Sequence, residues 1–242
     1  MPLSGLLNLL FPSRCPVCDK PSDSYLYNPV CSDCWSQIQK YSGPACNVCG
    51  IPSVSQHITI CEACFKTKQP FSKILYYGLY EGTLRKSIHL LKFSGIKRLA
   101  KPLSRLLLSL PTPKADLIIP VPLHLKRLRE REFNQTALIG YCLSKELKIP
   151  IKIDNLIKTK ETPPQTSLGR KERLLNVKKA FTSFENVANT DILLIDDVIT
   201  SGATVSECSA SLTKAGAKSV TVLALAHSTP MDLKTAVFSE KR

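Results

Sequence analysis

Hydrophobic and polar positions follow two different patterns along the 242-residue chain. Up to about residue 70, short apolar stretches are broken by turn-forming residues and cysteines. Beyond residue 70, apolar runs of strand length alternate with segments of helical period. The predicted strands cover residues 73–79, 116–121, 151–153, 191–198 and 219–226. The predicted helices cover residues 82–93, 97–110, 134–147 and 203–215.

The longest apolar runs indicate the fold class. LIIPV, ILLI and VTVLALA are continuous rather than alternating, which is typical of parallel strands with both faces covered. Alternation of such strands with helices predicts an α/β domain with a mostly parallel sheet and flanking helices. We place this domain at residues 71–242 and a small cysteine-rich region at residues 1–70.

The cysteine-rich region is a tandem repeat. Eight of the ten cysteines form four C-x-x-C pairs, and shifting the first two pairs by 31 and 30 residues lays them on the last two. Two such pairs can bring four thiolates around one tetrahedral Zn²⁺, and a module of about 30 residues needs a staple of this kind to fold. Four cysteine ligands leave no open coordination position, so we expect two structural zinc sites. Disulfides would require an oxidising compartment instead.

The cysteines can be assigned to the two zinc ions in two ways. In the sequential assignment, which we adopt, one ion takes Cys15, Cys18, Cys31 and Cys34 and the other takes Cys46, Cys49, Cys61 and Cys64. An interleaved assignment, in which alternate C-x-x-C pairs share an ion, also fits the spacing. The two remaining cysteines, Cys142 and Cys208, lie in apolar helical contexts and are expected as small buried side chains.

Positive charge is concentrated in the middle of the chain. The formal net charge is +14, and residues 71–135 hold 13 Lys and Arg against 4 Asp and Glu. This excess favours polyanionic partners, among which nucleic acid, phosphorylated small molecules and anionic lipid all qualify. Solvated helix faces are the alternative explanation. Aromatic residues in the same part could stack on single-stranded bases or pack in the core; they are Tyr76, Tyr77, Tyr80 and Phe93.

The run DILLIDDVITSGAT at residues 191–204 has the features of a ligand site. A predicted buried strand ends in Asp196 and Asp197, at the edge where open α/β sheets bind ligands. The following loop opens into a helix, whose N-terminus favours a phosphate. Carboxylates accept hydrogen bonds from vicinal hydroxyls, so the pattern predicts a ribose 5-phosphate site, with a capped helix after a turn as the alternative. The loop residues are Thr200, Ser201, Gly202, Ala203 and Thr204.

IDDVITSGAT resembles the phosphoribosyl diphosphate motif of type I phosphoribosyltransferases. The whole chain is similar to the ComF family, specifically to ComFC-type proteins, with matching segments LFPSRCPVC, IHLLKFSG, DLIIPVPLHLKRLREREFNQ and QTSLGRKERLLNV. Members join a double zinc ribbon to a phosphoribosyltransferase-like domain and serve DNA uptake in natural transformation. The resemblance therefore implies a type I phosphoribosyltransferase-like fold that binds phosphoribosyl diphosphate with Mg²⁺.

The resemblance also implies residues that contact a diphosphate or a DNA backbone. The segment PVPLHLKRLREREFNQ corresponds to the diphosphate-facing loop and supplies Lys126, Arg127 and Arg129, of which Lys126 and Arg127 are also the catalytic candidates. Glu132 stands where the family pattern usually has Gly. A carboxylate there opposes anion binding, so we leave Arg131 out of the candidate contacts.

A second basic segment supplies two further candidate phosphate contacts. The segment QTSLGRKERLLNV looks like the flexible hood loop of phosphoribosyltransferases, which excludes water during the reaction. From this loop Arg170 and Arg173 could reach bound phosphates. An amphipathic helix over residues 168–177 with an exposed basic face is the alternative.

Together these features favour a DNA-uptake factor that binds phosphoribosyl diphosphate and has affinity for single-stranded DNA. The alternative is an active phosphoribosyltransferase of nucleotide or amine metabolism, for which the sequence names no acceptor. A scaffold whose zinc ribbons bind a helicase or channel protein of DNA uptake is a third hypothesis.

The sequence also gives expectations about location. No apolar run approaches the roughly 18 residues that a membrane-spanning helix needs, so we do not expect an integral membrane protein. Residues 1–11 lack the basic leader and cleavage site of a signal peptide. We therefore expect the protein in the cytoplasm, where the DNA-uptake function would bring it to the inner face of the membrane.

Overall fold

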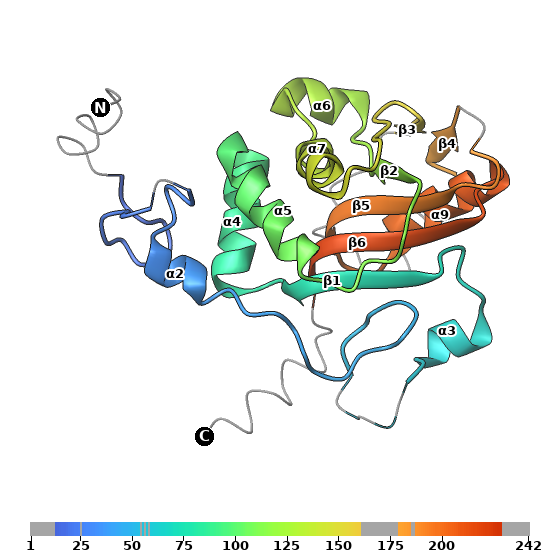
Figure 1. The fold of residues 1–242 in the computed structure, drawn as a ribbon, viewed down its shortest axis with the longest axis horizontal. Helices are drawn as coiled ribbons and strands as arrows, with labels where there is room; N and C mark the ends of the chain where they lie inside the picture. The colour runs from blue at the N-terminus through green and yellow to red at the C-terminus, as the bar shows by residue number, and fades with distance from the viewer. Residues whose placement is uncertain are drawn as a thin grey trace.

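A parallel sheet of four strands organises the part of the chain that the computed structural model describes (Figure 1). The described residues are 13–24, 26–53, 55, 57, 59–160, 179–184 and 187–228. The strand order is β1-β6-β5-β2, and all three strand pairs are parallel. The strands are β1 (Lys73–Leu79), β2 (Leu117–Pro120), β5 (Asp191–Ile199) and β6 (Ser219–His227). The predicted α/β fold with a mostly parallel sheet is confirmed.

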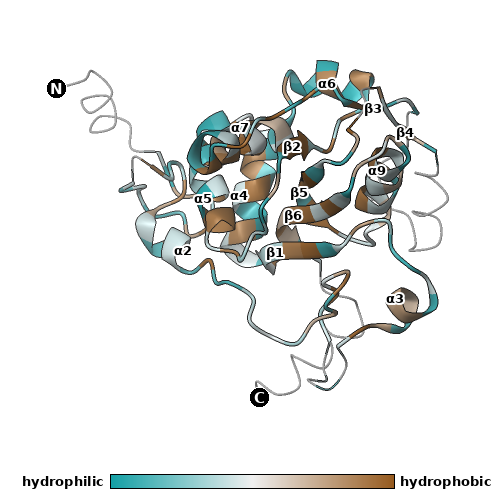
Figure 2. Cartoon of the chain, turned by 45° about the vertical axis from the view of Figure 1, so that its right-hand side comes forward, coloured by the Kyte–Doolittle hydropathy of each residue, from teal (hydrophilic) through white to brown (hydrophobic). Residues whose placement is uncertain are grey.

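Helices cover both faces of this sheet, which explains the long apolar runs in β2, β5 and β6 (Figures 1 and 2). Residues of α4, α5 and α7 form a core on one face, and residues of α9 form a second core on the other. The helices are α2 (Ser32–Ser36), α3 (Glu62–Lys66), α4 (Gly82–Phe93), α5 (Ala100–Leu108), α6 (Leu125–Arg131), α7 (Gln135–Leu147) and α9 (Ala203–Lys214), with the short 3-10 helix η1 (Lys97–Leu99) before α5. Cys208 of α9 is fully buried, as expected, whereas Cys142 of α7 is only partly buried.

The structure differs from the predicted elements in several places, one of which is α6, a helix that the pattern did not predict. Ile151 forms only an isolated bridge with Ile118, so residues 151–153 are not a strand. The segment predicted as one helix at 97–110 divides into η1 and α5. Two short strands that the pattern did not predict, β3 (Leu156–Lys158) and β4 (Phe181–Ser183), pair antiparallel beside α9. Runs of three residues are too short for their periodicity to be recognised.

The first cysteine module packs on the helices of the α/β domain. Val30 and Trp35 are buried in the same core as Leu84 and Ile88 of α4. The side chain of Arg98 also donates to the backbone oxygen of Asn28, at 2.7 Å. The module and the helical layer therefore stabilise each other by burying common apolar surface.

The second module lies along the edge of the sheet. Ile74 of β1 donates its N–H to the carbonyl of Val48 at 2.8 Å, and Tyr41 donates to the carbonyl of Tyr77 at 2.7 Å. Because β1 is an edge strand, these bonds satisfy groups that would otherwise be free to pair with another chain. The division at residue 70 stays a prediction, since both modules share apolar cores with the α/β domain.

Candidate functional site

Two adjacent carboxylates lie at the carboxyl end of β5. The side chains of Asp196 and Asp197 are buried, and Asp196 Oδ1 accepts a 2.8 Å hydrogen bond from the N–H of Asp197. Burial and then the charge of Asp197 raise the pKa of Asp196 to about 7, while the ammonium of Lys92 lowers it. Such a pair needs nearby cations and hydrogen-bond donors to remain ionised.

Lys92 and Gln135 supply that compensation to Asp197. Lys92 Nζ lies 2.7 Å from Asp197 Oδ1, and Gln135 Nε2 donates to Asp197 Oδ2 at 2.6 Å. Lys92 comes from the last turn of α4 and Gln135 from the first turn of α7, so Asp197 faces the layer of these helices. Neither residue was among the predicted site residues, although both lie within the segments that resemble the ComF family.

Arg131 extends this network toward the surface. Its Nη1 donates to Gln135 Oε1 at 2.6 Å, and its guanidinium lies 4.9 Å from the ring centroid of Phe93. Burial lowers the pKa of Arg131, and Asp197 opposes that change. Arg131 was not among the predicted contacts. In the structure it is linked to Asp197 through the side chain of Gln135, which accepts from Arg131 and donates to Asp197. The neighbouring Glu132 has a φ of 65°, in the left-handed region that favours glycine.

The predicted diphosphate contacts lie on α6. Lys126 and Arg129 are exposed on this helix, and the ring of His124 caps it by accepting from the N–H of Lys126 at 3.3 Å. Arg127 is close enough to Arg131 for its charge to lower the pKa of that residue. Contact of these side chains with a ligand stays a prediction. The other two candidates, Arg170 and Arg173, lie outside the described residues.

The predicted phosphate loop connects β5 to α9. Gly202 is the N-cap of α9 with a φ of 76°, a conformation that glycine adopts without strain. A Cβ added to Gly202 would meet no atom within 4 Å, so the space beside this residue is open. The Ala203 N–H donates weakly to Ser201 Oγ at 3.4 Å. The Ser228 N–H donates to the carbonyl oxygen of Ile199, at the end of β5, at 2.8 Å. The first turn of α9 can thus present backbone N–H groups to an anion.

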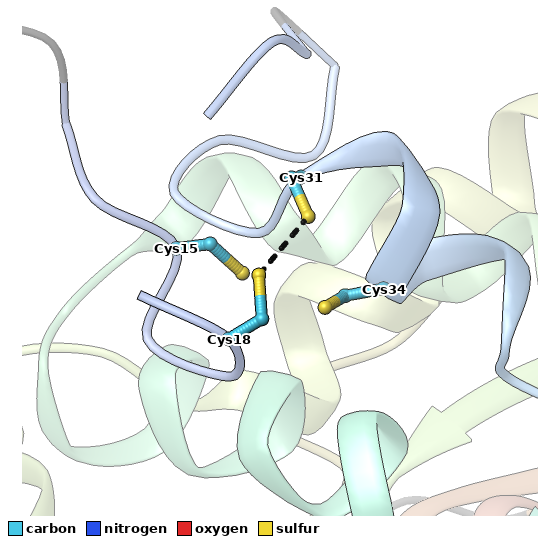
Figure 3. A group of neighbouring side chains, drawn as sticks. All are labelled: Cys15, Cys18, Cys31 and Cys34. Carbon is cyan, nitrogen blue, oxygen red and sulfur yellow. Dashed lines mark hydrogen bonds between the residues drawn. The ribbon is translucent and has the colours of Figure 1, made fainter. Parts of the chain in front are cut away.

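Each group of four cysteines gathers its sulfur atoms around one point. The ligand atoms of Cys15, Cys18, Cys31 and Cys34 lie within 4.8 Å of one another, as do those of Cys46, Cys49, Cys61 and Cys64. Figure 3 shows the side chains of the first group pointing toward one another, with 3.7 Å between the sulfurs of Cys18 and Cys31. Metal–sulfur bonds of about 2.3 Å give a tetrahedron with edges of about 3.8 Å. The structure therefore has the sequential grouping and not the interleaved one.

The two cysteine groups repeat one backbone geometry. Asp19 and Gly50 follow the first C-x-x-C of each module and both have positive φ, 61° and 69°. Burial raises the pKa of Cys15, but hydrogen bonds from the backbone of Cys31 and Cys18 outweigh it and lower that pKa to about 6. Burial raises the pKa of Cys64 to about 12. Metal binding must therefore displace protons from some of the thiols.

Comparison with known families and structures covers both regions. The double zinc ribbon domain matches residues 6–68. The fold is similar to part of the glutamine phosphoribosylpyrophosphate amidotransferase from B. subtilis complexed with ADP and GMP, with a TM-score of 0.40, 23% identity and coverage of 57% of this chain and 30% of that one. The UMP synthase of Leishmania donovani gives a TM-score of 0.35, 20% identity and coverage of 65% and 27%.

Curated relatives match the chain along most of its length. The "DNA utilization protein YhgH" of Escherichia coli (strain K12) is 32% identical over 227 residues, which is 90% of this chain and 98% of the relative. The "Competence protein F" of Haemophilus influenzae is 34% identical, covering 83% and 91%. The "Competence protein ComFC" of Bacillus subtilis is 29% identical, covering 72% and 74%. Identity above 30% over nearly whole relatives, together with the double zinc ribbon, shows that the chain belongs to the ComF family of competence and DNA-utilization proteins.

Proposed function

We propose that the protein is a DNA-uptake factor that binds phosphoribosyl diphosphate with Mg²⁺ at the end of β5 and has affinity for single-stranded DNA. One observation carries the proposal. The buried carboxylates of Asp196 and Asp197 stand at the carboxyl edge of a parallel sheet, directly before a glycine-capped helix start. A sugar hydroxyl group and a phosphate would both find suitable partners there.

The arrangement of contacts supports a division of roles within this site. Both oxygens of Asp197 are engaged by Lys92 and Gln135, whereas Asp196 has one oxygen on a backbone N–H. Asp196 would accept from a ribose hydroxyl. The loop of residues 200–204 would hold the 5-phosphate, and Lys126 and Arg127 would meet the diphosphate, which brings Mg²⁺ with it. Arg129, Arg170 and Arg173 are the remaining proposed contacts to a diphosphate or to DNA.

The cysteine groups would each hold one structural Zn²⁺. All four sulfurs of a group face a common centre, so no coordination position remains for a substrate. Because the first module shares a core with α4, zinc there would also stabilise the layer that carries Lys92. The ribbons would in addition be surfaces for helicase or channel proteins of DNA uptake.

The affinity for DNA and the location rest on charge and on the relatives. The net charge of +14 favours polyanions, and the relatives carry names that refer to DNA utilization and competence. Within the described residues, no helix is long and apolar enough to span a bilayer. We place the protein in the cytoplasm, peripheral to the inner face of the membrane.

Calorimetric titration of the zinc-loaded protein with phosphoribosyl diphosphate and Mg²⁺ tests the proposed site. The wild type is expected to bind, and the Asp196→Asn/Asp197→Asn variant is expected to lose binding while keeping its zinc. Asp191→Asn is the matched control, since this carboxylate lies at the opposite end of β5 and pairs with Lys218. Wild-type affinity in the double variant would place the site elsewhere, and no binding by the folded wild type would refute the proposed ligand.

A further inference from the structure

A stripe of cations and aromatic rings runs along the exposed side of α4. Arg85, His89 and Phe93 are spaced four residues apart, so they lie on one side of the helix. All three are exposed, and Phe93 is 63% exposed. A single exposed apolar side chain is ordinary on a protein surface, so the exposure of Phe93 alone indicates nothing.

The contacts of these residues distinguish them from scattered surface groups. The guanidinium of Arg85 lies 5.7 Å from the ring centroid of Tyr80. The rings of His89 and Phe93 are 4.6 Å apart, and the guanidinium of Arg131 lies 4.9 Å from the ring of Phe93. Two guanidinium groups and three aromatic rings thus lie along one side of α4 and the residues that flank it. We call this group of residues the α4 stripe and define it as Tyr80, Arg85, His89, Phe93 and Arg131.

The α4 stripe ends at the acidic site. Lys92, the neighbour of Phe93, pairs with Asp197, and Arg131 reaches Asp197 through Gln135. Of the aromatic residues proposed for base stacking, Tyr76 is buried, stacks on Tyr41 and contacts His227 at a tilt, so it is not available to a base. Phe93 is the exposed member of that set.

Proteins that bind single strands without reading sequence combine aromatic platforms for bases with cations for the backbone. The α4 stripe offers both, and it belongs to the part of the chain with the largest excess of positive charge. We propose that the α4 stripe binds single-stranded DNA, with Phe93 as the base-stacking platform and Arg85 and Arg131 as phosphate contacts. This inference rests on the single-stranded DNA affinity in the proposed function and adds its location.

Binding of labelled oligonucleotides, followed by fluorescence anisotropy, tests the platform. The two probes are an oligothymidylate and an abasic oligonucleotide with the same number of phosphates. Phe93→Ala is expected to weaken binding of the oligothymidylate by about fivefold or more and to leave the abasic probe unchanged, because base stacking is lost and charge is not. Phe184→Ala is the matched control, since Phe184 is 65% exposed and follows β4, beside α9 on the other side of the sheet.

A charge variant tests the phosphate contacts separately. Arg85→Met is expected to reduce the slope of log affinity against log salt concentration by about one. Lys145→Met, which removes an exposed cation from α7, is expected to leave the slope unchanged.

The outcomes of these binding experiments distinguish a failure of the α4 stripe from a failure of the proposed function. Equal affinities of Phe93→Ala and Phe184→Ala for the oligothymidylate would overturn the platform. Equal binding of the two probes by the wild type would also overturn it, while leaving an affinity for polyanions. No binding of either probe by the wild type would refute both the stripe and the proposed DNA affinity, whereas titration with phosphoribosyl diphosphate tests the sugar site independently.

Discussion

Lys92 and Asp197 form a 2.7 Å ion pair that joins the last turn of α4 to the end of β5. Their side chains are 18% and 6% exposed, so little water screens the pair. Asp197 also sits next to Asp196, and two neighbouring buried carboxylates repel each other. The ammonium of Lys92 therefore offsets part of this repulsion.

Removal of that ammonium should be costly. We expect Lys92→Met to lower the free energy of unfolding by about 3–5 kcal/mol, the range for a buried charge that loses its partner. Lys86→Met, on the exposed side of the same helix, should change it by less than about 0.5 kcal/mol. Urea unfolding of both variants measures the difference. Adding Asp197→Asn to Lys92→Met should recover part of the loss, and equal stability of the two lysine variants would mean that the pair contributes nothing.

Features set by residues close together in the chain could be predicted from the sequence, whereas contacts between distant residues could not. The strands β5 and β6 are nine residues each and contain long apolar runs, and each C-x-x-C turn brings two sulfurs together, so both features were predicted. The hydrogen bond from Gln135 to Asp197 joins residues 62 positions apart, and no local pattern encodes it. The short β4 depends on tertiary contacts such as the 2.7 Å bond from Ser183 to Asn155.

The raised pKa of Asp196 should make the stability of the protein depend on pH. Burial and the charge of Asp197 raise the pKa of Asp196 to about 7, above the value of 3.8 for an unperturbed aspartate. Between these values the folded state holds a proton that the unfolded state has lost, so this group lowers stability as pH rises toward 7. The stability of Asp196→Asn relative to wild type should therefore increase from pH 5 to pH 7 and then level off.

Thermal or urea unfolding at several pH values checks this expectation. Zinc binding changes with pH in both proteins alike, so the comparison with the wild type removes its contribution. A difference in stability that stays constant from pH 5 to pH 8 would show that the pKa of Asp196 is not raised.

Glu132 occupies a backbone position that favours glycine. It ends α6 with a φ of 65°, and the left-handed region costs a residue with a Cβ about 1–2 kcal/mol. The family resemblance puts glycine at this place, and the structure supplies the physical reason. We expect Glu132→Gly to raise the free energy of unfolding by about 1 kcal/mol.

The neighbouring Glu130 provides the control for that substitution. It lies inside α6, so Glu130→Gly should lower stability by about 1 kcal/mol because glycine disfavours a helix interior. Both variants lose one negative charge, and opposite signs in urea unfolding would thus isolate the backbone effect. Loss of stability in both variants would contradict this expectation. It would show that the Glu132 side chain stabilises the fold by more than the free-energy cost of its positive φ.

Loss of zinc from the first cysteine module should destabilise the α/β domain, because the two share a core. Cys34→Ser is expected to reduce the zinc content from two ions to one per chain and to destabilise the protein, since Cys34 and Trp35 share a core with Ile88 of α4. Cys142→Ser keeps both cysteine groups intact and should retain two ions.

The same sites should bind zinc more weakly as pH falls. Burial raises the pKa of Cys64 to about 12, whereas backbone hydrogen bonds overcome burial to lower the pKa of Cys46 to about 7, so the metal-free second group retains protons at neutral pH. Zinc must displace these protons, and a lower pH opposes that step. Calorimetry in two buffers with different ionisation enthalpies should show proton release on zinc binding at pH 7. An observed enthalpy independent of the buffer would mean that the thiols are already ionised in the metal-free protein.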